Sequence, residues 1–280
     1  MVQEWVVAGS QPVTAVPHVS QIMHLVRADP PARPTALVLA GCGGGGATTT
    51  TLGIAAQMAR RVAVVAVDGT HADGDLAIRG ADHRYSALTM HNWLASATTP
   101  AGIGLASVLS QASSGVRLLS SDPAALPNRE TLASVCQRLN TEGLATVVDG
   151  GSAVTARQLR PLLDQPQIRP ILVIPARYDA ANRVAVTLAR LDTEFGEALI
   201  ASTVLVVSHQ TPNTPPVSDA LAAHYRGWIH RVIDVPYDSH LAGGMTVTDA
   251  ALAAPTRRAY REIVWATTTY HRHDRRTVDG

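Results

Sequence analysis

Continuous apolar runs recur along this chain, and segments with apolar residues at helical spacing lie between them. A short apolar run bounded by turn residues is typical of a strand buried on both faces of a parallel sheet. The predicted strands lie at residues 35–39, 61–68, 115–120, 144–149, 171–175, 203–208 and 232–235. The predicted helices lie at residues 52–59, 128–140, 180–191 and 255–268. This alternation predicts an α/β fold with three layers, α-β-α, around a mostly parallel central sheet.

Composition supports a globular protein with one large core. Of the 280 residues, 46% are hydrophobic and 16% are charged, which excludes a disordered chain. Phe195 is the only phenylalanine, so Val, Leu, Ile and Ala must fill the core. The net charge of +1 argues neither for nor against nucleic acid as a partner. Cys42 and Cys136 lie in different predicted elements, which favours a reducing compartment, and we expect Cys136 to be a small core residue.

A glycine-rich loop connects the first predicted strand to the first predicted helix. In it, Gly41 and Gly46 match the glycines of the phosphate-binding pattern G-x-x-x-x-G-K-[ST], and Thr48 matches its hydroxyl residue. Glycines let the backbone approach phosphate oxygens, and a helix N-terminus offers free N–H groups. The lysine position holds Ala47, and all 23 Lys+Arg of the chain are arginine. A flexible glycine linker is the alternative, which the flanking apolar strand and helix argue against.

Two predicted strands end in an aspartate that is followed by glycine. Asp68 precedes one glycine at the end of the second strand, and Asp149 precedes two at the end of the fourth. In open α/β sheets, ligands bind at the C-terminal edge of the strands. We therefore expect Asp68 and Asp149 to lie at this edge, close to Thr48.

The glycine loop resembles the deviant phosphate loop, K-G-G-x-G-K-T-T, of the ParA/MinD family of dimerising ATPases. The matching residues are Gly43, Gly44, Gly46, Thr48 and Thr49. The family's two lysines fall on Cys42 and Ala47. The resemblance covers about residues 35–268, and it implies a P-loop NTPase-like fold of the ParA/MinD type.

Further segments carry the same resemblance. Of the family's D-x-D-P pattern the chain keeps only the second acid, Asp68, and Asp149 resembles the Walker B aspartate. Residues 70–80 resemble the first switch region, with Asp73, Gly74 and Asp75 in it. Residues 232–238 resemble a late strand and the family's I-P-Y-D turn. The family's base-reading Asn falls on Ser208, a departure that leaves the base preference open.

The resemblance implies ATP and Mg²⁺ as cofactors. The residues that would bind nucleotide are Gly41, Gly43, Gly44, Gly45, Gly46, Thr48, Thr49 and Ser208. Thr48 and Asp149 would hold Mg²⁺, and Asp68 and Asp149 would be catalytic in an active enzyme. No pattern of metal-ligand spacing and no Ser/His/Asp hydrolase motif stands out in the sequence.

The missing lysines weaken the expected chemistry. One charge-assisted hydrogen bond is worth roughly 1.5–3 kcal/mol, so losing it weakens nucleotide binding about ten- to a hundredfold. Hydrolysis suffers more, because a cation near the transferred phosphoryl group acts mainly in the transition state. An arginine could substitute, and the candidates in or near the switch regions are Arg79, Arg84, Arg157 and Arg160.

The extent of the resemblance predicts three parts of the chain. They are an N-terminal extension at residues 1–34, the ParA/MinD-like domain at 35–270 and a polar tail at 271–280. The proline-rich extension has one helical segment, 18–27, whose apolar stripe packs on the domain or docks a partner; we expect proteolysis there first. The last helix either closes the domain with Tyr260, Ile263 and Val264, which we expect, or binds a membrane surface.

No apolar run is long enough to span a membrane, and Glu4 and Trp5 do not resemble a signal peptide. We therefore expect a cytoplasmic protein, or one peripheral to a membrane complex. Its partners would be proteins, including a second copy in a homodimer, and nucleic acid stays open.

Three interpretations of function follow. The first is a ParA/MinD-like pseudo-ATPase with weak or no nucleotide binding, working as a structural or regulatory component of secretion, conjugation, partition or positioning machinery. The second is an active ATP-dependent dimerising switch with a substitute cation. The third is a module that binds DNA or a membrane surface without nucleotide. The arginine-only, alanine-rich composition resembles that of high-GC actinobacteria, where such proteins accompany type VII secretion.

Overall fold

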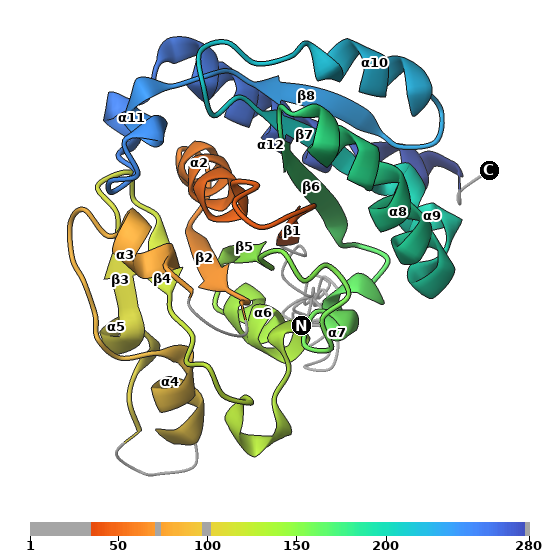
Figure 1. Cartoon of the computed structure of the whole chain (residues 1–280). Coiled ribbons are helices and arrows are strands. Elements are labelled where there is room, and N and C mark those ends of the chain that lie inside the picture. The colour runs from red at the N-terminus through yellow and green to blue at the C-terminus, as the bar shows by residue number, and fades with distance from the viewer. Residues whose placement is uncertain (1–34, 71–73, 97–101, 278–280) are drawn as a thin grey trace, which may run out of the picture. The chain divides into compact units, whose positions relative to one another are not determined.

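The computed structural model describes residues 35–70, 74–96 and 102–277, with side chains as far as Thr268. The predicted extension, Asp73 and residues 278–280 lie outside the described residues. Within them an eight-stranded sheet has the order β3-β4-β2-β5-β1-β6-β7-β8 (Figure 1). Its strands are β1 (Thr35–Ala40), β2 (Val64–Asp68), β3 (Leu109–Gln111), β4 (Arg117–Leu119), β5 (Ala145–Asp149), β6 (Arg169–Pro175), β7 (Val204–Ser208) and β8 (Arg231–Val235).

All seven predicted strands are confirmed, and the sheet is parallel except at one edge. There β3 pairs antiparallel with β4. The sequence did not predict β3, a three-residue strand in a segment of mixed polar and small residues. Edge strands this short leave almost no periodic pattern to detect. The predicted α/β fold with its mostly parallel sheet is therefore correct.

Helices cover both faces of the sheet, as the three-layer prediction requires (Figure 1). The helices of one face are α2 (Ala47–Ala59), α3 (Leu76–Gly80) and α12 (Ala254–Thr277). Those of the other face are α6 (Leu132–Thr141), α7 (Arg160–Leu163), α8 (Tyr178–Phe195), α9 (Glu197–Ser202) and α10 (Val217–His224). The remaining helices are α4 (Met90–Ser96), α5 (Leu105–Val108), α11 (Ser239–Ala242) and the 3₁₀ turns η1 (Pro127–Arg129) and η2 (Asp249–Ala251).

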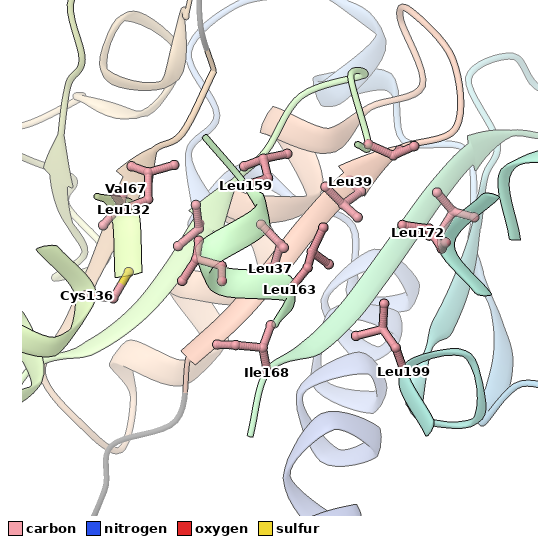
Figure 2. Packing of buried hydrophobic residues seen from close by; sticks show 14 of the residues in the cluster. Leu37, Leu39, Val67, Leu132, Cys136, Leu159, Leu163, Ile168, Leu172 and Leu199 are labelled. Atoms are coloured by element: carbon pink, nitrogen blue, oxygen red, sulfur yellow. The ribbon is translucent and has the colours of Figure 1, made fainter. Parts of the chain in front are cut away.

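The strands separate two hydrophobic cores, because successive side chains of a strand point to opposite faces. Leu37 and Leu39 of β1 point into the core beneath α6, α7 and α8, which also contains Cys136, as predicted (Figure 2). Val38 points to the other face, among the buried residues of α2 and α12. Such two-sided burial explains why the strands are continuously apolar.

The C-terminal helix closes the second core, as predicted. Tyr260 and Ile263 are fully buried on α12, and Val264 packs against the same cluster. The ring of Tyr260 lies directly over Gly53 of α2, where no side chain separates the two helices. The helix begins at Ala254 and ends at Thr277, so it takes in residues 271–277, which the sequence assigned to a polar tail.

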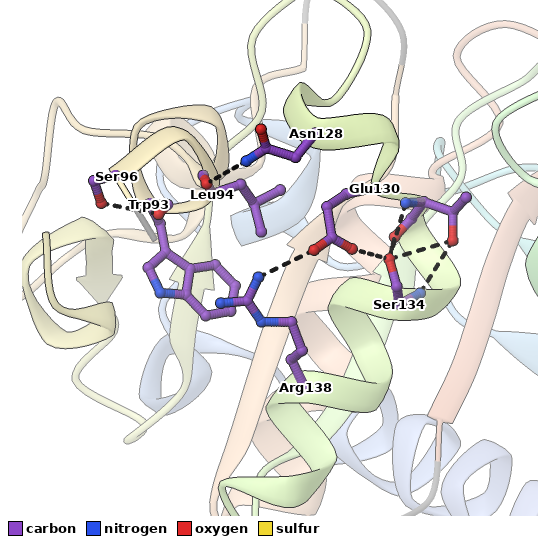
Figure 3. Close-up of polar contacts among 8 residues, drawn as sticks. Trp93, Leu94, Ser96, Asn128, Glu130, Ser134 and Arg138 are labelled. Carbon is purple, nitrogen blue, oxygen red and sulfur yellow. Dashed lines mark hydrogen bonds and ion pairs between the residues drawn. The ribbon is translucent and has the colours of Figure 1, made fainter. Parts of the chain in front are cut away.

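A cluster of polar contacts links α4 to α6 (Figure 3). The Arg138 guanidinium lies 4.4 Å from the centre of the Trp93 ring. Its Nη1 is also 3.2 Å from Glu130 Oε1. Asn128 Nδ2 donates to the Leu94 carbonyl at 3.0 Å. Thr131 caps α6 by accepting a hydrogen bond from the Ser134 amide at its hydroxyl, and the Thr131 amide donates to Ser134 Oγ in return. These contacts fix α6, which begins at Leu132 and not at residue 128 as predicted.

Candidate functional site

The glycine loop runs from Gly41 to Gly46, between β1 and α2. Its first residue is tied to the neighbouring strand, because the Gly41 amide donates to the Val173 carbonyl at 2.8 Å. The Gly45 amide turns back to the Cys42 carbonyl at 3.1 Å. Gly46 has φ 97°, a left-handed conformation that favours glycine. The loop therefore has a fixed path that ends at a helix N-terminus.

Helix α2 begins at Ala47, five positions before the start that the sequence predicted at Leu52. Its first internal hydrogen bond runs from the Thr50 amide to the Gly46 carbonyl at 2.9 Å, and no side chain caps the helix. The amides of Ala47, Thr48 and Thr49 precede that bond, so they have no partner within the helix. Free amides at the positive end of a helix dipole can bind a phosphate group, which agrees with the phosphate-binding loop that the sequence predicted.

A cavity of about 560 Å³ opens over this helix start. Gly43, Gly44, Gly45, Gly46, Thr48 and Thr49 line it, so six of the eight residues predicted to bind nucleotide surround one space. Gly41 is not among the lining residues, because it packs under the loop against β6, where an added Cβ would lie 2.8 Å from Ile174 Cγ2.

Ser208 lies at the end of β7 beside Gly46, not in the wall of the cavity. Its Oγ is 3.6 Å from the position that a Cβ on Gly46 would take. The next two residues, His209 and Gln210, do line the cavity. Gln210 Nε2 donates to the Gly44 carbonyl at 2.6 Å and so holds the loop from the β7 side. Sequence reasoning missed both residues, since only their position one and two residues beyond a strand end marks them.

Asp149 lies beneath the helix start at the end of β5. Only 1% of it is exposed, and burial raises the pKa of its carboxyl to about 6, against hydrogen bonds from the Thr48 side chain and the Gly151 amide. The Gly151 amide is 3.1 Å from Asp149 Oδ1. The predicted closeness of Asp149 and Thr48 is confirmed. A hydroxyl beside a carboxylate forms a pair of oxygen donors that fits hydrated Mg²⁺.

Asp68 is the register partner of Asp149 on β2, so both acids lie at the predicted C-terminal edge. Asp68 is turned toward its own strand end, where it accepts hydrogen bonds from the Thr70 amide at 3.0 Å and the Thr70 hydroxyl at 2.6 Å. Burial is the main cause that raises the pKa of the Asp68 carboxyl. Asp68 lines a second cavity, of about 450 Å³, with Arg157, and it does not line the loop cavity.

The two positions of the missing lysines differ in their surroundings. Ala47 lines the loop cavity, and its side chain is 6% exposed within the core beneath α2. Cys42 is half-buried and packs against the core on the opposite face of the sheet. A methyl group and a thiol thus stand where the resemblance places two positive charges.

Of the four arginines considered as substitutes, the structure brings Arg79 alone into the wall of the loop cavity. Arg84 donates to the carbonyls of Ala106 and Leu109 near β3. Arg157 lies in the second cavity, and Arg160 forms an ion pair with Glu194. Among the described residues that line the loop cavity, the acidic ones are Asp75 and Asp238.

The described residues contain no helix long and apolar enough to cross a membrane. Nor do residues 35–70, 74–96 and 102–277 hold a cluster of His, Cys, Asp and Glu side chains that could bind a metal ion by themselves.

The parallel sheet, the glycine loop ahead of α2 and the aspartates at the strand ends define an α/β fold of the P-loop type. No protein-family model matches the sequence, and a comparison with curated proteins also found no match. Solved structures do match, and they show that the fold is that of the ParA/MinD-family ATPases.

Three of these structures illustrate the likeness. A ParA family ATPase from Chlorobium tepidum has a TM-score of 0.63 at 16% identity, over 84% of this chain and 98% of its own. The cell division ATPase MinD of Pyrococcus furiosus has a TM-score of 0.61 at 17% identity, over 85% and 99%. The septum site-determining protein MinD of Pyrococcus horikoshii, complexed with Mg-ADP, has a TM-score of 0.58 at 15% identity, over 84% and 94%.

Proposed function

We propose that this protein is a pseudo-ATPase with a ParA/MinD-type fold. It keeps a loop that fits phosphate, binds Mg-nucleotide weakly at best and does not turn it over. It acts as a structural or regulatory component of a larger assembly, of the kind that partitions, positions or secretes other molecules. Its partners are proteins, which include a second copy of the chain.

The observation that carries this proposal is that uncharged residues, Ala47 and Cys42, occupy both lysine positions of the loop. A cation at the transferred phosphoryl group lowers the barrier by stabilising charge that develops in the transition state. The helix N-terminus and the Thr48–Asp149 pair remain, so ground-state contacts to phosphate and Mg²⁺ survive. The site thus retains features for binding and lacks the side-chain charge that favours turnover.

The similar structures support nucleotide and Mg²⁺ as the ligand class. The MinD of Pyrococcus horikoshii is complexed with Mg-ADP, and a McdA variant of Cyanothece is complexed with ATP. Similar structures include a putative plasmid partition protein of Borrelia burgdorferi, a cell division ATPase and a septum site-determining protein, and these roles support an assembly or positioning role for this chain.

The proposal is tested by phosphate release from Mg-ATP with the purified full chain. We expect no release above that of Asp149→Ala, a matched control that removes the proposed Mg²⁺ contact. Steady release by the unmodified chain that disappears in Asp149→Ala would overturn the pseudo-ATPase proposal. It would favour the second candidate, an active switch, for which the cavity's arginine is the supporting observation.

A further inference from the structure

The charges around the loop cavity are unbalanced. Asp75 and Asp238 line it, and Asp149 lies buried below it. Arg79 is the only permanently charged cation among the described residues of its wall. A triphosphate that enters this space meets carboxylates on two sides, so Mg²⁺ and Arg79 are the charges available to attract it.

Arg79 is held at the cavity by contacts that leave its terminal nitrogens available. Its backbone carbonyl accepts from the Val247 amide at 2.7 Å, which fixes the end of α3. Its Nε donates to the Met245 carbonyl at 3.3 Å, and this orients the guanidinium. The side chain is 22% exposed, so it is neither free in solvent nor fully enclosed.

Within the described residues, the two terminal nitrogens make only long contacts. Nη2 is 3.5 Å from Thr49 Oγ1, and Nη1 is 3.8 Å from Asp75 Oδ2. Both distances exceed those of strong charge-assisted hydrogen bonds, which are about 2.7–2.9 Å. A phosphate oxygen placed between the first turn of α2 and α3 would replace these contacts with shorter ones. The planar fork of a guanidinium suits such bidentate binding of phosphate.

We propose that Arg79 supplies the positive charge that position 47 lacks, by binding the terminal phosphates of an Mg-nucleoside triphosphate in the loop cavity. This inference rests on the proposed function, because it concerns the same site. The positive charge would thus be carried by a residue of α3 that lies beside the first turn of α2, and not by a lysine of the loop. The predicted first switch segment, which contains α3, would therefore contact the phosphates directly.

The inference explains how binding and turnover can separate. Thr49 is the neighbour of Arg79 on α2, whereas Ala47 stands two residues earlier, at the helix start. A cation anchored beside Thr49 gives ground-state affinity to the outer phosphates. Because it replaces one of the two missing lysines, and Cys42 leaves the other unreplaced, turnover stays absent.

Calorimetry with Mg-ATP tests the inference on the full chain. We expect Arg79→Gln, which keeps a donor for the Met245 carbonyl and removes the charge, to bind about ten- to a hundredfold more weakly. Arg60→Gln is the matched control, since Arg60 lies at the far end of α2 in an ion pair with Asp249. It should bind within about twofold of the unmodified chain. Adding Ala47→Lys to Arg79→Gln should restore at least tenfold of the loss.

A second measurement does not depend on any variant folding. Phenylglyoxal modifies arginines, and mass spectrometry locates the adducts. Mg-ATP should protect Arg79 from the reagent and leave Arg60 reactive, whereas Mg²⁺ alone should protect neither. Equal modification of Arg79 with and without bound Mg-ATP would overturn the inference.

The possible failures are distinguishable. Unchanged affinity in Arg79→Gln, or no binding by the unmodified chain at millimolar Mg-ATP, overturns the role of Arg79 and leaves the pseudo-ATPase proposal standing. Phosphate release by the unmodified chain overturns the pseudo-ATPase proposal, whatever the affinity of Arg79→Gln.

Discussion

The ring of Tyr260 rests on the bare backbone of Gly53, so closely that a Cβ at Gly53 would lie 2.3 Å from Tyr260 Cε2. This contact joins the helix that follows the phosphate loop to the last helix of the described chain. Tyr260 is fully buried, and burial is the main cause that raises the pKa of its hydroxyl.

The first prediction is that Gly53→Ala lowers stability. Alanine favours a helix by about 1 kcal/mol over glycine, but overpacking a core costs about 1–3 kcal/mol. Because the obstacle is a buried ring between two helices, we expect the overpacking to prevail. Urea unfolding followed by circular dichroism measures the change.

Gly104→Ala is the control for this substitution, because an added Cβ there meets no atom within 4 Å. Tyr260→Leu in the Gly53→Ala background should recover part of the loss that is caused by the contact. A net gain in the free energy of unfolding of Gly53→Ala would contradict the prediction.

The second prediction concerns pH. The pKa of Asp149 is raised from 3.8 to about 6, mainly by burial, so the folded state holds a proton that the unfolded state has lost between these values. The contribution of Asp149 to the free energy of unfolding is therefore greatest below about pH 4. It is lost as the pH rises from about 4 through 6. Asp149→Asn removes the penalty of about 2–3 kcal/mol at neutral pH.

The measurement is the free energy of unfolding of both proteins from pH 4 to pH 8, without Mg²⁺. The advantage of Asp149→Asn should grow across that range and level off above about pH 7. Thr141→Val, an exposed substitution away from the site, is a control that should follow the unmodified chain. An advantage that does not depend on pH would show that Asp149 titrates normally.

The third prediction is that Ala47→Lys strengthens the binding of Mg-ATP about ten- to a hundredfold. Ala47 lies at the helix start in the wall of the cavity, so a lysine stem at this position begins beside the cavity. Ala222→Lys on the exposed side of α10 adds the same charge elsewhere and should leave affinity unchanged. Titration calorimetry measures the affinity of each variant for Mg-ATP. Equal increases in affinity in both variants would mean that only the net charge of the protein matters.

The fourth prediction concerns the contact between α4 and α6 (Figure 3). Arg138→Ala loses the contact with the Trp93 ring and the ion pair with Glu130. The side chain is partly exposed, so we expect a loss of about 0.5–2 kcal/mol. Arg138→Lys should recover part of it, and Trp93 fluorescence should shift in the alanine variant. No change in unfolding or fluorescence would mean that the cluster is not stabilising.

Much of the fold could be predicted because burial on both faces leaves a strong signal in the sequence. Residues 171–174 are all apolar, residues 145–149 are apolar except for Thr146 and the terminal Asp149, and both segments form central strands. The start of α2 could not be predicted, because Thr48 to Thr51 are β-branched and poor helix formers. Their burial beside the sheet, most complete at Thr51, outweighs that preference.

The candidate site likewise contains residues that the sequence indicated and residues that it did not. Its glycines and Asp149 follow local patterns, so the sequence pointed to them. The choice of Arg79 over Arg84 depends on where each side chain lies in the fold, Arg79 beside α2 and Arg84 beside β3, and no local pattern encodes that. His209 and Gln210 reach the cavity only because β7 lies two strands from the loop, at a distance in sequence that no motif spans.

The position of Tyr260 also orders events during synthesis. The ribosome makes α2 early, but the ring that covers Gly53 belongs to α12, which starts at Ala254. At about 5–20 residues per second, roughly 10–40 s separate the end of α2 from the start of its cover. Throughout that interval the side of α2 that packs against α12 in the folded protein lacks this cover, so apolar surface of the phosphate-loop helix stays exposed until α12 is made.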